Sequence, residues 1–347
     1  MTLQDRFRSH SPKSIYLDFQ HQKELISLIR SHGWIPNSDS ILAIEKPGEG
    51  NMNFVVRVKT SSRSLIIKQS RPWVEKYPQI AAPSERIFVE AAFYKALGED
   101  SFYNDYCPAI IGIDTSNYLF AMEDLGQAAD CCFLYREDSV LSEPDIEYLT
   151  DFVSHLHNHA IGDRHTFPDN SALIKLNHTH IFHYPFLENN GFNLDSIQSG
   201  LEEIAIRYKR DDALKERLKK LGDVYLQSGN TLIHGDYYPG SWLKTNTGIK
   251  IIDPEFSHFG NAEFDLGVML AHLKMARLND VAKKVWDRYI IPAEFSTPLL
   301  VSFCGVEIMR RIIGLAQLPL SLSLEEKAKL LSQAAQWIQH PEHQEIF

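Results

Sequence analysis

The chain has 347 residues, enough for about two domains of ~150 residues each, and its 44% of hydrophobic residues is sufficient for a folded core. Its 45 acidic residues outnumber its 35 basic ones, and the net charge of −10 argues against non-specific binding to nucleic acid, which depends on neutralising phosphates. The sequence lacks apolar runs of about 18 residues, the length of a membrane span, and its polar N-terminus has no signal-peptide core. Four cysteines without CxxC spacing are typical of reduced thiols. We therefore expect a cytoplasmic globular protein that binds neither membranes nor nucleic acid.

The first third of the chain alternates short β-branched runs with turn residues, a pattern typical of antiparallel strands. We expect strands at residues 41–46, 54–58, 65–69, 109–113 and 119–123. A helix is expected over residues 83–97, because Pro83 and Ser84 are typical of a helix N-terminus.

After Gly126 the apolar spacing becomes helical, most clearly over residues 142–159. Further helices are expected at residues 195–207, 213–227, 263–276, 298–315 and 324–339. Two short β runs interrupt them at residues 231–233 and 249–252. The sequence thus predicts an α+β protein with a β-rich N-lobe, residues 1–124, and a mostly helical C-lobe, residues 125–347.

The strongest chemical signal is His234-Gly-Asp236, followed by Asp253-Pro-Glu255, with each triplet placed after a short β run. Acidic residues that leave neighbouring strands can meet at one point. Phosphoryl transfer needs one carboxylate to orient the attacking hydroxyl and others to hold Mg²⁺ against the phosphates. Asp236 fits the first role, and Asp253 and Glu255 fit the second. The triplet His-Gly-Asp by itself is weak evidence, because it also arises by chance in turns.

These motifs resemble those of the aminoglycoside phosphotransferase and choline kinase superfamily, which has a protein-kinase-like fold with two lobes. The methylthioribose kinases within it are similar in three segments of this chain, which are residues 234–241, 252–256 and 264–267. The resemblance implies that Ser241 is a metal ligand, since the superfamily usually has a metal-binding Asn there. Tyr237 and Tyr238 depart from the Leu-His that the family carries after its Asp.

Gly48 and Gly50 lie between the first two expected strands, where their backbone can approach phosphates closely. A glycine-containing hairpin with no ligand is the alternative. Lys68 lies in an otherwise apolar strand and needs an anionic partner, which Glu90 on the next helix can supply. A Lys–Glu pair that holds phosphates is the arrangement of protein kinases.

The resemblance extends this nucleotide-binding half. It implies that Asn53 and Lys68 contact ATP. It also implies that the segment Glu123, Asp124 and Leu125 is the hinge whose backbone hydrogen-bonds the adenine.

Arg310 and Arg311 lie in an apolar helical segment. Consecutive helical residues point about 100° apart, so both cannot face one pocket equally. One surface arginine and one structural ion pair are therefore the plain alternative. The resemblance to the Arg-Arg segment of the methylthioribose kinases implies a role in binding the acceptor, together with Asp236, and we favour Arg311 slightly over Arg310.

Histidines invite a second hypothesis, because His155 and His159 have the i, i+4 spacing of a zinc site. The hypothesis is a metal-dependent hydrolase, but the sequence lacks the Glu of an HExxH motif at these histidines. Three further histidines, His178, His180 and His183, are interpreted as loop residues.

We expect an enzyme that transfers the γ-phosphate of ATP, with Mg²⁺ as cofactor, to a hydroxyl of a small metabolite. A sugar such as 5-methylthioribose is the best single candidate for this acceptor. An aminoglycoside or choline-type acceptor is the alternative within this class, and a nucleotide-binding pseudokinase without turnover is the alternative outside it. The resemblance is also compatible with a homodimer, although no interface can be read from the sequence.

Overall fold

A computed structural model describes residues 1–48, 50–344 and 346 of the chain. The chain forms two compact units. The first comprises Met1–Ala128, His165–Leu173 and Lys250–Phe256, and the second comprises Ala129–Arg164, Ile174–Ile249 and Ser257–Phe347. The lobe boundary expected between residues 124 and 125 stays a prediction. The boundary between the compact units lies close to it, after Ala128, and the later segments His165–Leu173 and Lys250–Phe256 also belong to the first unit.

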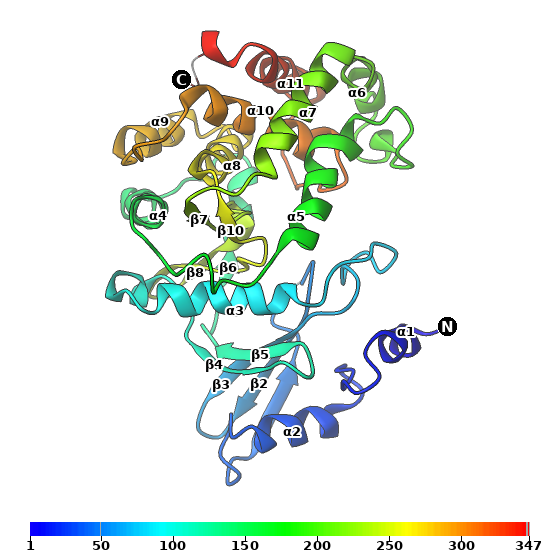
Figure 1. Cartoon of the computed structure of the whole chain (residues 1–347), viewed down its shortest axis with the longest axis vertical. Helices are drawn as coiled ribbons and strands as arrows, with labels where there is room; N and C mark the ends of the chain where they lie inside the picture. The colour runs from blue at the N-terminus through cyan, green and yellow to red at the C-terminus, as the bar shows by residue number, and fades with distance from the viewer. Residues whose placement is uncertain (49, 345, 347) are drawn as a thin grey trace. The chain divides into compact units, whose positions relative to one another are not determined.

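The first unit is built on a five-stranded antiparallel sheet (Figure 1). Its strands in spatial order are β1 (Ile41–Glu45), β2 (Phe54–Thr60), β3 (Ser64–Gln69), β5 (Leu119–Glu123) and β4 (Ile110–Asp114). All five strands expected from the sequence are present. The last two form a hairpin whose second strand, rather than the first, pairs with β3.

Side chains of the sheet alternate between its two faces, as the period of two requires. Leu65 and Ile67 of β3 pack in a core with Leu25 and Ile29 of helix α2 (Gln22–Ser31). Lys68, the next residue of β3, points to the other face and reaches helix α3 (Arg86–Leu97). Because of this alternation, Lys68 lies on the face of the sheet that is turned away from the apolar core. A further helix, α1 (Leu3–His10), precedes the sheet.

The second unit is mostly helical. Its helices are α4 (Glu143–Asn158), α6 (Leu201–Lys209), α7 (Asp212–Tyr225), α8 (Ala262–Met275), α9 (Asn279–Arg288), α10 (Thr297–Ile313) and α11 (Leu324–Gln339). Helix α10 packs against α8 and α11 (Figure 1). Nearly every residue of α8 is buried, which is typical of a helix at the centre of a core. The predicted α+β class, with a β-rich part and a helical part, is confirmed.

Short strands accompany these helices. β7 (Thr231–Ile233) pairs with β10 (His258–Gly260), while β6 (Ala129–Asp130), β8 (Trp242–Thr245) and β9 (Gly248–Ile251) form a separate sheet. The two β runs that precede the acidic triplets, β7 and β9, are therefore not neighbouring strands, and that expectation is wrong. The partner of β7 comes from a later part of the chain, which local patterns cannot reveal.

Other differences lie at the helices. The helix expected at residues 195–207 begins at Leu201, directly after Gly200, whose φ of 85° is left-handed and favours glycine. The sequence predicts loop positions for three histidines, but His178 lies at the end of helix α5 (Ser171–His178), and His180 and His183 lie in a π-helical turn, Thr179–His183. Helices α1, α2, α5 and α9 were not predicted.

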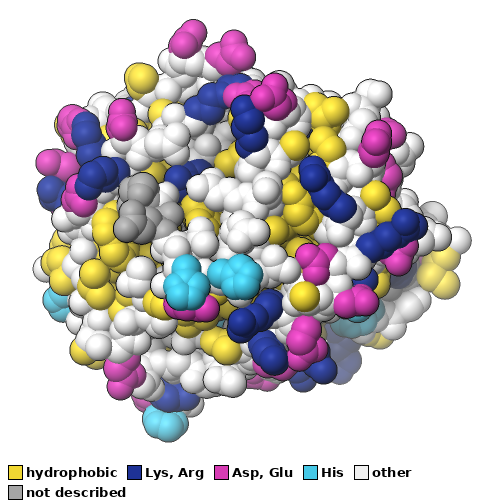
Figure 2. Space-filling view, turned by 90° about the horizontal axis from the view of Figure 1, so that it is seen from above, with side chains coloured by type: hydrophobic (Ala, Val, Ile, Leu, Met, Phe, Trp, Pro, Cys, Tyr) yellow, Lys and Arg dark blue, Asp and Glu magenta, His cyan; other side chains and the backbone are white. Residues whose placement is uncertain are grey.

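None of the helices in the described residues has the length and apolar character needed to cross a membrane. The face of the molecule shown in Figure 2 carries basic and acidic side chains mixed together. Such mixing is typical of a solvated protein surface.

Candidate active site

The glycine-containing loop before β2 is tied to the acidic triplet at residues 253–255. A side chain at Gly50 would place its Cβ 2.6 Å from the carbonyl oxygen of Asn53, so the loop needs glycine there. At Gly48, by contrast, an added Cβ meets no described atom within 4 Å. Nδ2 of Asn53 donates to Oε2 of Glu255 over 2.8 Å, and Oδ1 of Asn53 is buried with no partner among the described residues. Glu49, between the two glycines, lies outside those residues.

Lys68 is the central cation of the first unit. Its Nζ lies 2.5 Å from Oε1 of Glu90 on α3, and it also pairs with Oδ1 of Asp253. Burial by itself would lower the pKa of Lys68, but Asp253 and Glu90 outweigh it and raise the pKa above its usual value. The Lys–Glu pair expected from the sequence is present, and the lysine is held charged.

Carboxylates outnumber cations around Lys68. Burial raises the pKa of Glu90 to about 7 and that of Glu255 to about 8, although Lys68 and Arg86 respectively oppose the shift. Nε of Arg86 lies 3.7 Å from Oε2 of Glu255. The crowded negative charge means that an added cation would lower the free energy of this site.

The residues fit a magnesium ion in their donor chemistry. Asp253 and Glu255 offer carboxylate oxygens, which Mg²⁺ prefers, and the side chain of Asp253 is 47% exposed. Within the described part of the chain, no group of three or more His, Cys, Asp or Glu side chains is arranged to hold a metal. A pair of carboxylates is what Mg²⁺ uses when phosphates complete its coordination.

Asp253 has an unusual backbone. Its φ of 62° lies in the left-handed region, which non-glycine residues adopt mainly where the surroundings hold them. Its backbone N–H donates to the hydroxyl of Tyr94 over 3.1 Å. Nδ2 of Asn170 donates to the carbonyl oxygen of Glu255 over 2.8 Å. Tyr94 and Asn170 therefore hold this segment, and sequence reasoning missed both.

At the expected hinge, side chains are occupied by the protein itself. Oε2 of Glu123 accepts the backbone N–H of Ala109 over 3.2 Å, and the carboxylate of Asp124 pairs with Arg57 at 2.8 Å. Asp124 and Glu123 are thus placed as structural residues by their side chains. The backbone N–H of Glu123 is also taken, by the carbonyl of Ala109, so binding of adenine by the other main-chain groups of residues 123–125 stays a prediction.

In the second unit, Asp236 follows β7 in a loop held by α8. Asp265 of α8 accepts the backbone N–H of His234 at 2.6 Å and of Gly235 at 2.8 Å. Oγ of Ser241 donates to the carbonyl oxygen of Asp236 over 2.9 Å. These bonds fix the loop at both of its ends.

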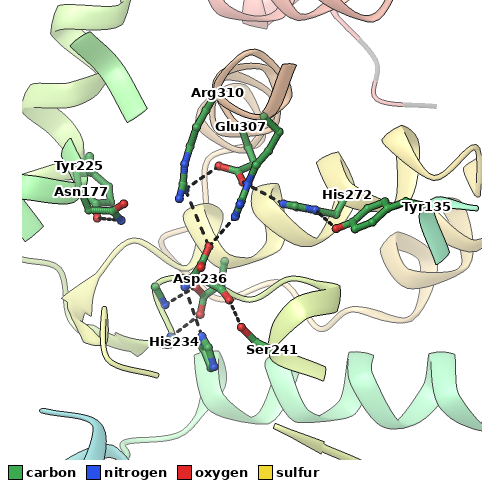
Figure 3. A network of polar contacts seen from close by, with 12 residues as sticks. Tyr135, Asn177, Tyr225, His234, Asp236, Ser241, His272, Glu307 and Arg310 are labelled. Carbon is green, nitrogen blue, oxygen red and sulfur yellow. Dashed lines mark hydrogen bonds and ion pairs between the residues drawn. The ribbon is translucent and has the colours of Figure 1, made fainter. Parts of the chain in front are cut away.

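The carboxylate of Asp236 faces the arginine pair of α10 (Figure 3). One guanidinium nitrogen of Arg311 lies 3.0 Å from Oδ1 of Asp236, and one of Arg310 lies 4.0 Å from it. Both arginines also bind Glu307, at 2.6 Å for Arg311 and 3.1 Å for Arg310. Burial raises the pKa of Asp236, whereas Arg311 and Arg310 oppose the shift.

The alternative of one surface arginine is wrong, because Arg310 and Arg311 are both buried, and the two approach Asp236 unequally, as their separation on the helix predicts. Glu307 precedes the pair by three and four residues, which places it on the same side of the helix as both. Two long side chains can therefore converge on one carboxylate even though their Cα–Cβ bonds diverge.

The histidine pair gives no support to a zinc site. The rings of His155 and His159 stack at 3.6 Å between their centroids. Among the described residues, neither histidine belongs to a group of three or more His, Cys, Asp or Glu side chains that could hold a metal ion.

The sequence pattern of the phosphotransferase enzyme family (APH) matches residues 43–298. The chain belongs to this family. The expected class of enzyme, a phosphotransferase that acts on an alcohol group, is thereby confirmed.

Among curated relatives, the methylthioribose kinase of Exiguobacterium sibiricum is 26% identical over 339 residues, which cover 85% of each chain. That of Bacillus velezensis is 25% identical over 357 residues, covering 87% of this chain and 88% of the relative. The predicted resemblance to methylthioribose kinases is confirmed by these two relatives.

Solved structures support the fold. The choline kinase LicA from Streptococcus pneumoniae superposes with a TM-score of 0.53 at 14% identity, covering 92% of this chain and 99% of that one. The spectinomycin phosphotransferase APH(9)-Ia gives a TM-score of 0.50, also at 14% identity, covering 92% and 98%. The predicted protein-kinase-like fold is confirmed.

Sequence reasoning missed three residues that organise this site in the second unit. Asp265 lies in the segment 264–267, and the resemblance of that segment to the methylthioribose kinases is the signal that could have found it. Glu307 could have been found from its spacing to Arg310 and Arg311. His272, which binds Glu307, carries no local signal.

Proposed function

We propose that this phosphotransferase is an ATP- and Mg²⁺-dependent kinase that phosphorylates a hydroxyl of 5-methylthioribose. The observation that carries the proposal is the partly buried carboxylate of Asp236 held by Arg311, in a chain whose curated relatives are methylthioribose kinases over more than four fifths of its length. The same relatives support a small hydroxylated molecule as the acceptor.

We assign the nucleotide to residues of the first unit. Lys68, held charged by Glu90, is suited to bind the α and β phosphates, with Asn53 and the backbone at Gly48 and Gly50 beside them. The main chain of Glu123, Asp124 and Leu125 is assigned to the adenine. AMP bound to the choline kinase LicA, and ADP bound to the spectinomycin enzyme, support a nucleotide for this family.

Asp253 and Glu255 would hold the metal, with Ser241 as a further oxygen donor. Mg²⁺, when bound, neutralises charge on the phosphates. The hydroxyl hydrogen of Ser241 is engaged by the carbonyl of Asp236, and its lone pairs remain available for a cation.

Asp236 is assigned to the acceptor hydroxyl. Its carboxylate accepts the proton as the hydroxyl oxygen forms a bond to the γ-phosphorus. The bond from that phosphorus to the β,γ-bridging oxygen breaks, and its electron pair leaves with ADP. Arg311 opposes the rise in the pKa of Asp236 and so favours the ionised form of this carboxylate, which can accept a proton.

The contacts of the two arginines favour different roles for them, and they favour Arg310 rather than Arg311 as the residue that binds the acceptor. Arg311 is bound by both Glu307 and Asp236, whereas Nε of Arg310 is buried and has no partner among the residues described. We therefore assign Arg310 to the acceptor. Two arginines beside two carboxylates give a balanced local charge, which suits a neutral sugar better than cationic choline or an aminoglycoside.

A panel of acceptors tests the proposal. ADP release is measured with 5-methylthioribose, ribose, choline and kanamycin, and ATP binding is measured by calorimetry. We expect release with 5-methylthioribose and its loss in Asp236→Asn, which should still bind ATP. Preferred turnover of choline or kanamycin would overturn the acceptor, and ATP binding without turnover of any acceptor would favour the pseudokinase. The homodimer and the cytoplasmic location stay predictions.

A further inference from the structure

A chain of buried polar side chains runs from the arginine pair into the interior of the second unit (Figure 3). Oε1 of Glu307, on α10, lies 2.9 Å from Nε2 of His272 on α8. The other ring nitrogen of His272, Nδ1, lies 2.5 Å from the hydroxyl of Tyr135. All three side chains belong to residues that are at most 2% exposed. We call Tyr135, His272 and Glu307 the relay.

The chemistry of the three groups fixes where the protons lie. Burial raises the pKa of Glu307, but Arg310 and Arg311 outweigh it and hold the pKa well below its usual range, so Glu307 only accepts. Nε2 of His272 therefore carries the proton of that hydrogen bond. Burial lowers the pKa of His272 to about 4 against the opposing hydrogen bond to Glu307, so the ring is neutral at pH 7.

Tyr135 completes the assignment. Burial raises the pKa of its hydroxyl well above the usual value, so the group is protonated. Nδ1 of the neutral imidazole has a free lone pair and accepts this O–H. Each donor of the relay has one acceptor, and the direction of donation leads from Tyr135 through His272 to Glu307.

The relay and the loop of Asp236 share one helix. Asp265 and His272 are seven residues apart on α8, which is about two helical turns and places them on the same face. Asp265 holds the loop through the backbone of Gly235, and His272 holds Glu307. One buried helix therefore sets the position of Asp236 through its loop and the position of the arginine pair through Glu307.

The ring of Tyr238 packs against both Arg311 and His272. Its ring lies 4.5 Å from the guanidinium carbon of Arg311 and 4.9 Å, between centroids, from the ring of His272. A tyrosine at this position is one of the departures from the family pattern. Its ring limits the rotation of both side chains, which favours a single geometry for Arg311.

We infer that Tyr135 and His272 are positioning residues for the phosphoryl transfer, because they orient Glu307, and Glu307 in turn aligns Arg311 on the carboxylate of Asp236. The inference rests on the proposed role of Asp236. It goes further, because it assigns a role in the reaction to two side chains that touch neither the acceptor nor the nucleotide.

The first experiment needs no acceptor. The Nε–H of Arg311, which donates to Glu307 over 2.6 Å, is followed by ¹⁵N NMR relaxation in the wild type, His272→Leu and Tyr135→Phe. If the relay orients Glu307, either substitution loosens Glu307 and Arg311 together, so the order parameter of this N–H should fall. An unchanged order parameter in both variants would overturn the inference, whether or not the acceptor is 5-methylthioribose.

The second experiment is kinetic, with 5-methylthioribose and ATP. We expect His272→Leu to lower kcat about tenfold or more, as loss of a supporting partner does, and to leave the KM for ATP unchanged. His272→Gln, whose amide can still donate to Glu307, should recover part of the loss. Ile308→Val, which trims a fully buried side chain of α10 outside the relay, is the control for stability.

The outcomes are distinct. A fall in kcat for His272→Leu that Ile308→Val reproduces at a similar melting temperature would reduce the relay to a structural role. Absence of turnover in the wild type would count against the proposed function alone, because the NMR relaxation of Arg311 still decides the inference.

Discussion

Oδ1 of Asp265 accepts the backbone N–H of Gly235 over 2.8 Å, and both groups are buried. The other carboxylate oxygen takes the N–H of His234. A buried backbone N–H needs a partner, and here one side chain supplies two. The loop that presents Asp236 is therefore shaped by α8 as much as by its own sequence.

Asp265→Asn should lower both stability and activity. An amide has one acceptor oxygen, so its NH₂ group would face one of the two N–H donors, at a cost of about 1–3 kcal/mol. Thermal unfolding and kcat are the measurements, with Asp280→Asn on the surface of α9 as the control. The pKa of Asp265 is held below its usual value by His157 against the effect of burial. This contribution is present above pH 4 and lost in more acid solution, so the gap between variant and wild type should narrow there.

Replacing each arginine of the pair by lysine should have a different kinetic effect. Arg311→Lys should lower kcat by about tenfold or more, because an ammonium cannot bridge Glu307 and Asp236 with the planar fork of a guanidinium. Arg310→Lys should mainly raise the KM for the acceptor. Steady-state kinetics at varied acceptor check both, and Arg277→Lys, in a surface pair with Glu326, serves as the control. Equal effects of the two lysine variants on kcat and KM would contradict the assignment.

Glu255 should make the free protein less stable as the pH rises. Burial raises its pKa from 4.5 to about 8, so its contribution is present in full below about pH 4.5 and is lost as the pH rises to about 8. Glu255→Gln cannot ionise and should be more stable than the wild type at pH 8.5, by about 1–3 kcal/mol. Melting temperatures at pH 5 and 8.5 test this, and a difference that does not grow with pH would refute it. The same variant should lose activity if Glu255 binds the metal.

Ser241 should tolerate Asn better than Val. Asn offers an oxygen for a cation and a donor for the carbonyl of Asp236, whereas Val offers neither and leaves that carbonyl with the backbone N–H of Tyr238 alone. The dependence of activity on Mg²⁺ concentration separates the two roles. A metal role predicts a higher Mg²⁺ requirement in Ser241→Val, and a purely structural one predicts a lower melting temperature at an unchanged requirement.

The sequence by itself determined the local features. The five strands of the first sheet and most helices of the second unit follow from periodicity and turn residues, because a strand or helix depends on neighbours a few residues away. The segments 234–241 and 253–255 were recognisable for the same reason, because the residues that form each motif are close together in the sequence.

The tertiary structure alone decided which of these features meet. Asn53 binds Glu255 from 202 residues away, and Arg311 reaches Asp236 across 75. The pairing of β7 with β10, the left-handed backbone of Asp253 and the relay through His272 likewise depend on contacts between distant segments. Burial then set the charge states of Glu255 and His272, because a pKa depends on the groups that surround a side chain in space rather than along the chain.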